Sequence, residues 1–321
     1  MIDKITFRAR LTTEVIADIA KNHRLMCWIN SDNTQVEYKS SEYSNLTGIE
    51  VSIKDNYLKL STSLHKYWQY RNFGKFRNDN EFTISEAKSA AAMLLSENRL
   101  NPDKTYVTYF EIGLNMNVSY DPLSFIELTN CIKTSTDKEM FNDANYRKNR
   151  QRTTEKHKDL RKYFKIYDKG WQMQEKEKEK EKSPKSCRDE TIKILRIETC
   201  HRRGKVISSK FFSDKNLSRL SSRFHDDWSG LSFVKEVTGK KGCRTSEVQN
   251  ADILINKGSG FLLDSIKKKI KPGLLTKNHL RTVREFIRDF DKLRSKFEIV
   301  ASEQEKEYND LLFSTFKSAI E

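Results

Sequence analysis

One short segment, FKIYDKG, alternates apolar and polar side chains and constrains the local fold more than any other stretch. Successive side chains of a strand point to opposite faces, so Phe164 and Ile166 are predicted to face the core together. Lys165, Tyr167 and Lys169 then share the other face. The segment is therefore predicted to be a strand that holds one tyrosine between two lysines. The alternative is an ordinary amphipathic strand with no chemical role.

A tyrosine among cations is a poor core residue but a good candidate nucleophile for a phosphodiester. The neighbouring ammonium groups stabilise a phenolate, which lowers the tyrosine pKa, and they neutralise the phosphate under attack. We therefore predict Tyr167 as the nucleophile, with Lys165 and Lys169 as assisting cations.

The chain is strongly basic. It carries 60 Lys and Arg against 45 Asp and Glu, a formal net charge of +15 over 321 residues. Such a charge favours association with a polyanion, and nucleic acid is the first candidate. The alternative is a soluble basic protein without such a partner.

Several classes of protein are not indicated by the sequence. No apolar run approaches the length of a membrane span, and the first residues alternate like a strand instead of forming a signal peptide. The five cysteines show no CxxC spacing and the six histidines show no HxH or HExxH pattern. The sequence therefore predicts a cytoplasmic protein with reduced thiols, no membrane association and no histidine-bound metal.

The hydrophobic pattern changes along the chain. Strand-like and helix-like segments alternate in the first part, whereas apolar residues recur with a helical period from about Gly204 onward. We predict an α+β protein with a mainly antiparallel sheet and flanking helices. Residues 1–203 are predicted to form the site-bearing domain, and 204–321 a basic helical C-terminal region.

Two charged segments interrupt the first part. Residues 133–162 are rich in Lys, Arg, Asn and Thr and are predicted to be a basic loop or arm, which either binds DNA or is merely solvated. Its proposed DNA-binding residues are Arg147, Lys148, Arg150 and Arg152. A second segment, about 171–188, contains a Glu/Lys alternation and is predicted to be a charged insertion that acts as a solvated connector.

Two glutamates extend the candidate site. Glu111 and Glu198 lie on the polar faces of two further predicted strands. If these strands pair with the tyrosine strand, the carboxylates join Tyr167 on one sheet face. Carboxylates are ligands for Mg²⁺ or Mn²⁺, and such an ion polarises a phosphate. The alternatives are a surface glutamate at 111 and an ion pair of Glu198 with Arg196 or Arg202.

These motifs resemble those of the rolling-circle replication initiators of filamentous phages and related plasmids, including a branch found in Bacteroidetes genomes. The resemblance covers roughly 1–203 and is carried by the opening MID, FEIGLN, IYDKG and LRIE. It implies a divergent HUH-like nickase core, although the chain has no His-hydrophobic-His motif. It also implies Tyr167 as nucleophile, Lys169 as a phosphate-side cation, and Glu111 and Glu198 as ligands of Mg²⁺ or Mn²⁺. Gln172 departs from the family, which often carries Glu there.

The resemblance implies a site-specific single-strand DNA endonuclease and ligase that initiates rolling-circle replication of a phage or plasmid. The reaction would pass through a 5′-phosphotyrosine, with origin DNA and host replication proteins as partners in a bacterial cytoplasm. Two alternatives remain within DNA biology: a mobilisation relaxase with the same chemistry, and a non-catalytic DNA-binding protein. A third is an RNA-binding protein that stacks bases on Trp68, Tyr70 and Phe73. Tyr163 is a weak candidate for a second cleavage.

Overall fold

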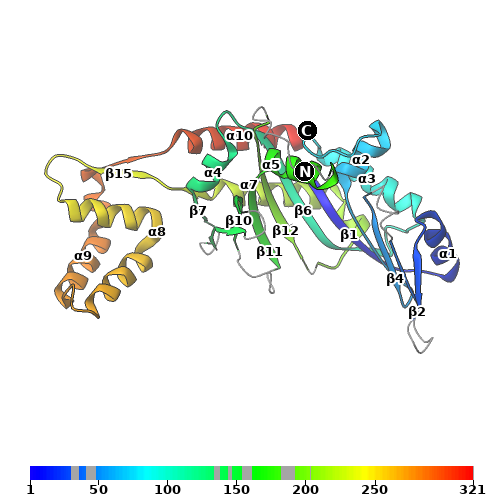
Figure 1. Cartoon of the computed structure of the whole chain (residues 1–321), viewed down its shortest axis with the longest axis horizontal. Helices are drawn as coiled ribbons and strands as arrows, with labels where there is room; N and C mark the ends of the chain where they lie inside the picture. The colour runs from blue at the N-terminus through cyan, green and yellow to red at the C-terminus, as the bar shows by residue number, and fades with distance from the viewer. Residues whose placement is uncertain are drawn as a thin grey trace.

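The computed structural model describes residues 1–29, 36–40, 48–133, 138–143, 147–153, 161–181, 192–202 and 204–320. It is an α+β protein built on one large antiparallel sheet, which confirms the predicted fold class (Figure 1). The strands lie in the spatial order β2 (Met26–Ile29), β3 (Val36–Lys39), β4 (Glu50–Lys54), β5 (Tyr57–Ser63), β1 (Ile2–Arg10), β6 (Thr105–Asn117), β12 (Ile194–His201), β11 (Lys162–Asp168), β10 (Arg147–Arg152) and β9 (Phe141–Asp143). A short strand, β13 (Val206–Ile207), also pairs with β6.

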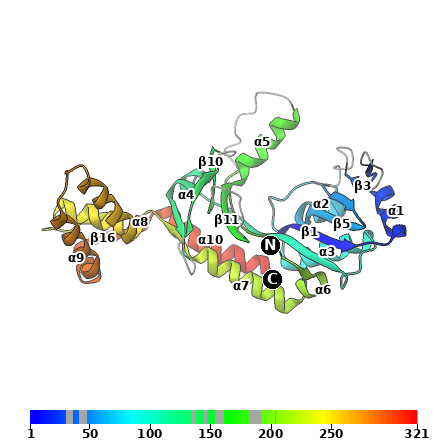
Figure 2. The same ribbon diagram turned by 90° about the horizontal axis from the view of Figure 1, so that it is seen from below.

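One face of this sheet is apolar, and helices cover it. Phe7, Phe164 and Ile197 are fully buried on that face. The covering helices include α3 (Ile84–Glu97), α7 (Asp214–Ser229) and α10 (Glu303–Ile320), of which α7 and α10 run side by side (Figure 2). Trp228 of α7 packs edge-on against Phe164, and its Nε1 donates to Thr199 Oγ1 at 3.0 Å. The polar face of the same strands is left for the candidate site.

Local sequence signals explain where α3 begins. Thr83 and Glu86 form a capping box, in which each side chain accepts a hydrogen bond from the backbone N–H of the other residue. The capping box therefore fixes the start of the helix at Ile84. The preceding helix, α2 (Leu64–Phe73), ends at Gly74, whose φ of 67° is unfavourable for a side chain.

Two charged segments are more regular than predicted. The described part of 133–162 contains the strands β8 (Lys138–Glu139), β9 and β10, so this part is sheet and not a loop. The tyrosine strand ends at Asp168, and Lys169 begins α5 (Lys169–Glu181) instead of continuing the strand. Asp168 Oδ1 accepts a hydrogen bond from the Trp171 N–H at 2.9 Å, which caps the helix. The Glu/Lys alternation continues this helix as far as Glu181, because both residues are good helix formers.

The C-terminal part contributes to two different cores. Residues of α7 and α10 belong to the main core, together with the short strands β7 (Thr129–Ile132) and β14 (Leu231–Phe233), so the predicted boundary at 203/204 lies within that core. A smaller unit projects away from the sheet (Figure 1). It consists of β15 (Glu236–Gly239), α8 (Thr245–Ile270), α9 (Lys277–Leu293) and β16 (Phe297–Val300). This unit has its own apolar clusters, centred on Phe286 with Phe297 and on Leu262 with Val283.

Among the helices that the structure describes, none is both long enough and apolar enough to cross a bilayer.

Candidate functional site

The three strands that carry the predicted site residues are neighbours in the order β6–β12–β11. Their register places Lys165 opposite Glu198, and Tyr167 opposite Arg196. Glu111 lies opposite Cys200 on the other side of β12. The sheet therefore gathers the tyrosine, one lysine and both glutamates on its polar face, as expected if these strands pair.

The Glu198 carboxylate is the centre of the cluster. Its Oε1 accepts hydrogen bonds from Tyr167 Oη at 2.8 Å and from Arg196 Nε at 2.7 Å. Its Oε2 accepts from Lys165 Nζ at 2.8 Å, and the same ammonium reaches Glu111 Oε1 at 3.1 Å. Glu198 and Tyr167 are only 3% and 4% exposed, so these contacts lie in a largely dehydrated environment. The suggested ion pair of Glu198 with Arg196 is present, alongside the contacts with Tyr167 and Lys165.

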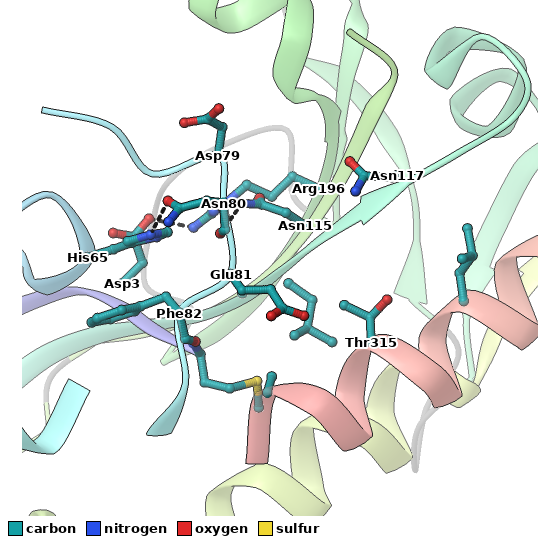
Figure 3. Close-up of a pocket in the computed structure, with 15 residues that line it drawn as sticks. Asp3, His65, Asp79, Asn80, Glu81, Phe82, Asn115, Asn117, Arg196 and Thr315 are labelled. Atoms are coloured by element: carbon teal, nitrogen blue, oxygen red, sulfur yellow. Dashed lines mark hydrogen bonds and ion pairs between the residues drawn. The ribbon is translucent and has the colours of Figure 1, made fainter. Parts of the chain in front are cut away.

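Residues distant in sequence complete the cluster. Arg196 forms an ion pair with Asp3 and donates to Asn115 Oδ1 at 2.8 Å. Asn78 Nδ2 donates to Asp3 Oδ2 at 3.1 Å, and Lys169 Nζ donates to Asn78 Oδ1 at 2.9 Å. Figure 3 shows the adjoining pocket, in which Asp3, Arg196 and Asn115 lie together. The roles of Asp3 and Asn78 were not predicted from the sequence, because the partner of Asp3 is 193 positions away and Asn78 lies outside any periodic segment.

Lys169 is placed by the first turn of α5. Its Nζ donates to Gln172 Oε1 at 3.2 Å, besides its bond to Asn78. Gln172, where the sequence differs from the initiators that its motifs resemble, is therefore a direct neighbour of the predicted phosphate-side cation. A glutamine amide supplies this hydrogen bond without the charge that glutamate would add.

A pocket of about 390 Å³ opens over the cluster. Tyr167 and both glutamates line it. The basic side chains that line it are Lys4, Lys66, Arg150, Lys165 and Lys169. A concave site with several cations beside a hydroxyl has the chemistry needed to bind a phosphodiester.

The charge state of Tyr167 differs from the sequence-based expectation. Burial and the adjacent Glu198 carboxylate raise the pKa of Tyr167 well above its usual value, despite the opposing effects of Arg196 and Lys165. Lys165 does lower this pKa, as predicted, but burial and Glu198 outweigh its effect, so the net decrease expected from the sequence is not found. Lys165 pairs with the Glu111 and Glu198 carboxylates, because its Nζ donates a hydrogen bond to each of them. Tyr167 is a neutral hydrogen-bond donor until its proton is removed.

The two lysines have opposite electrostatic environments. Burial and the nearby Arg196 lower the pKa of Lys169 to about 7. The pKa of Lys165 is raised well above its usual value, because the attraction of Glu198, Cys200 and Glu111 outweighs its burial. Lys165 is thus a permanent cation, whereas Lys169 changes its charge near neutral pH.

The predicted metal site can be tested against these contacts. Glu111, Glu198 and Cys200 have potential ligand atoms within 4.8 Å of one another. However, Lys165 Nζ already bridges the two carboxylates, and Tyr109 Oη donates to Glu111. The third member is a thiol, a poor ligand for Mg²⁺, and burial raises its pKa to about 12. With Lys165 bound to both carboxylates, these residues do not fit a resident Mg²⁺ or Mn²⁺. Metal binding at this site remains a prediction, and it requires the Lys165 side chain to move away from the carboxylates.

The four predicted DNA-binding residues occupy different positions along β10. Arg150 lies opposite Tyr167 in the strand register and lines the pocket. Arg152 is only 7% exposed and does not offer its side chain to solvent. The backbone of Arg147 and Lys148 belongs to β10, and their side chains lie outside the described part. Among these four, Arg150 is the one that the structure joins to the candidate site.

Gly113 allows the strands to approach one another beneath the cluster. A Cβ atom there would lie 3.0 Å from Glu198 Cγ and 3.0 Å from the Ile197 carbonyl oxygen. We expect Gly113→Ala to lower the free energy of unfolding by about 1–3 kcal/mol, because the backbone contact cannot relax freely. The matched control is Gly204→Ala, whose nearest contact would be an ordinary 3.6 Å. Urea denaturation of both variants measures the difference, and equal midpoints would contradict the argument.

No protein-family model matches this chain, and no curated protein is significantly similar to it in sequence. The resemblance to replication initiators therefore depends on the short motifs alone.

Proposed function

We propose that this protein is a site-specific single-strand DNA endonuclease and ligase that initiates rolling-circle replication, with Tyr167 as its nucleophile. One observation carries the proposal: the Tyr167 hydroxyl is hydrogen-bonded to a carboxylate in a pocket lined by five basic and four acidic side chains. The buried carboxylate accepts a proton and the surrounding cations bind the phosphate, which are the two requirements for attack by a phenol.

In the proposed reaction, Tyr167 Oη attacks the scissile phosphorus while its proton moves to Glu198. The bond from phosphorus to the 3′ oxygen breaks, and that oxygen takes up the proton to become a 3′-hydroxyl. The DNA is left joined to the protein as a 5′-phosphotyrosine. Lys169 and Arg150 line the pocket and are positioned to neutralise the phosphate, while Lys165 and Arg196 hold Glu198.

Religation reverses these steps and needs no nucleotide cofactor. A 3′-hydroxyl attacks the phosphotyrosine, the diester forms again, and the phenol of Tyr167 is restored. The energy of the original bond is stored in the phosphotyrosine throughout. The free 3′-hydroxyl is the primer that a host polymerase would extend in the proposed replication role. A relaxase acting on a transfer origin would use the same chemistry.

The second candidate function is a DNA-binding protein without catalysis. The observation that favours it is the ion pairing of Glu198 with Lys165 and Arg196, which lowers the pKa of this carboxyl well below its usual range and makes it a weak base.

A cleavage assay separates the two candidates. Single-stranded DNA from the genetic element encoding the protein is incubated with Mg²⁺ or Mn²⁺ and run on a denaturing gel, with and without protease. A protease-sensitive shifted band supports the nickase, whereas salt-sensitive binding without any covalent product supports the binder.

The charge of Lys169 predicts a pH dependence of DNA binding. A bound phosphate favours the ammonium form, so the affinity for single-stranded DNA is expected to fall as pH rises from 6 to 8.5 through the pKa of about 7. Arginine stays charged over this range, so Lys169→Arg is expected to have a flatter profile. Fluorescence anisotropy with a labelled oligonucleotide measures both. Parallel profiles for the two proteins would show that Lys169 does not contact the phosphate.

A further inference from the structure

A second and larger cavity, of about 1110 Å³, lies beside the site pocket on the polar face of the sheet. Strands β1, β5 and β6 form its floor, and Lys4, Glu50 and Ser61 line both cavities. The two cavities therefore adjoin along β1 and β5. We call the larger one the basic groove.

Its floor is built by the strand register. Arg8 lies opposite Lys59 on one side and Tyr106 on the other, and Arg10 lies opposite Tyr57. The period-2 rule turns these side chains to the open face, while Phe7 and Ala9 point into the core. The groove is thus a property of alternating residues in strands that are distant in sequence.

The groove is strongly cationic. Its basic lining residues are Lys4, Arg8, Arg10, Lys59, Lys104, Arg202 and Lys205, and its acidic ones are Glu50 and Asp103. Arg8, Arg10 and Lys59 are exposed and form no ion pair with any residue that the structure describes. Like charges held together without counter-charges are unfavourable in the free protein, and an incoming polyanion relieves this repulsion.

Aromatic rings lie among these cations. Tyr57 is 58% exposed at one end of the groove. Tyr106 lies on the floor, with Lys205 Nζ 4.9 Å from its ring centroid. Tyr109 also lines the groove and donates to Glu111, which lines the site pocket. Tyr57 is thus exposed and Tyr106 and Tyr109 are half-buried, all three among cations. Aromatic rings between cations are the arrangement that binds single strands, because bases stack on the rings while phosphates contact Lys and Arg.

We propose that the basic groove binds single-stranded DNA and leads it to Tyr167. The row from Lys4 to Arg10 spans about 20 Å at ~3.4 Å per residue, which is long enough to contact several nucleotides. A single strand fits better than a duplex, since a duplex keeps its base faces stacked and hidden from Tyr57 and Tyr106. Only the delivery to Tyr167 depends on the proposed nickase function, because strand binding in the groove does not require cleavage.

The test compares two triple variants of the full chain. Arg8→Gln/Arg10→Gln/Lys59→Gln removes three groove cations, and Arg281→Gln/Arg284→Gln/Arg288→Gln removes three cations from α9 in the projecting unit. The probe is a fluorescently labelled 20-nucleotide oligo-dT, measured by anisotropy over a series of salt concentrations. The groove variant is expected to lose at least about tenfold in affinity, and its salt slope to fall by roughly 2, since each phosphate contact contributes about 0.7. The α9 variant is expected to keep the slope of the unmodified protein.

Circular dichroism checks that each variant is folded. The charge-preserving variant Arg8→Lys/Arg10→Lys/Lys59→Arg is a second control and is expected to retain oligo-dT binding. Equal loss in the groove and α9 variants, or no loss in the groove variant, would overturn the proposal. The cleavage assay keeps this outcome separate from the nickase proposal. If the groove variant binds oligo-dT normally, the groove proposal fails and the test of cleavage by Tyr167 is unaffected. If single-stranded DNA from the encoding genetic element binds in the groove but is never cleaved, the groove proposal holds and the nickase proposal fails.

Discussion

Replacing Tyr167 by phenylalanine is expected to abolish the covalent DNA adduct and to slow cleavage at least about 1000-fold, because the substitution removes only the nucleophilic oxygen. Affinity for the oligonucleotide is expected to change less than about threefold, since the cations that line the pocket remain. The measurement is a time course of cleavage on a denaturing gel, together with anisotropy on the same preparation.

The fold is expected to tolerate this change. Loss of the hydroxyl leaves Glu198 with its bonds from Lys165 and Arg196, so the buried carboxylate keeps its charge partners. The cost is the single hydrogen bond at 2.8 Å, about 1–2 kcal/mol. Thermal unfolding of Tyr167→Phe checks this, and a variant that melts at nearly the temperature of the unmodified protein makes any loss of cleavage a chemical effect.

Two other tyrosines near the cluster provide the controls. Tyr163 accepts a hydrogen bond from Arg202 at 3.3 Å and is buried beside β12, and Tyr109 donates to Glu111. Tyr163→Phe and Tyr109→Phe are each expected to leave the first covalent adduct intact. An adduct that persists in Tyr167→Phe and maps by peptide mass spectrometry to Tyr109 or Tyr163 would transfer the nucleophile to that residue. Unimpaired cleavage with no adduct at any tyrosine would refute the phosphotyrosine mechanism.

The sequence predicted the strands of the site better than their interactions. Alternation in each strand placed Tyr167, Glu111 and Glu198 on polar faces, and the observed order β6–β12–β11 brings these faces together. Alternation contains no information on which strands pair or in which register, because pairing is decided by the whole sheet. The ion pair between Asp3 and Arg196 joins residues 193 positions apart, and no local pattern encodes it.

The tyrosine pKa shows a second limit of local reasoning. Two lysines next to a tyrosine in sequence predict a lowered pKa, and this would hold if both ammonium groups faced the phenol alone. In the folded chain, the pairing of β11 with β12 places Glu198 against both Tyr167 and Lys165, and burial adds its own penalty for a phenolate. The sign of the shift is therefore set by a partner that only tertiary structure supplies. The basic groove was not predicted for the same reason, since its cations are dispersed along β1, β5 and the segments that flank β6 and β12.

Replacing Lys165 by methionine is expected to lower the free energy of unfolding by about 3–5 kcal/mol, because it leaves two buried carboxylates without the ammonium that bridges them. Lys162→Met is the matched control on the same strand. Lys162 pairs with Asp227, but its side chain is 31% exposed, so its loss is expected to cost less than about 1 kcal/mol. Chemical denaturation at pH 7 measures both.

The pH dependence of Lys165→Met has a defined sign. In the unmodified protein the pKa of Glu198 is lowered, so its contribution to stability is present above the unfolded-state pKa and is lost as pH falls through the lower, folded-state pKa. Without Lys165, burial and repulsion from the nearby Glu111 carboxylate are expected to raise the pKa of Glu198 above the unfolded value. The variant is therefore expected to gain stability relative to the unmodified protein as pH falls from 7 to 5. A constant difference over this range would show that Lys165 does not neutralise the pair.

The same variant decides the role of a divalent ion. If Lys165 occupies the position of the predicted metal, Mg²⁺ or Mn²⁺ at millimolar concentration is expected to stabilise Lys165→Met by several degrees, while the unmodified protein responds little without DNA. Adding Glu111→Gln to Lys165→Met removes one ligand and is expected to abolish the response. Equal stabilisation of the unmodified protein would show that the carboxylates bind the ion with the lysine in place, and the cluster would then be a metal site in its resting state. If Mg²⁺ or Mn²⁺ does not stabilise Lys165→Met, the two carboxylates bind the lysine ammonium but no divalent ion. Cleavage would then depend on the charged side chains of the protein alone.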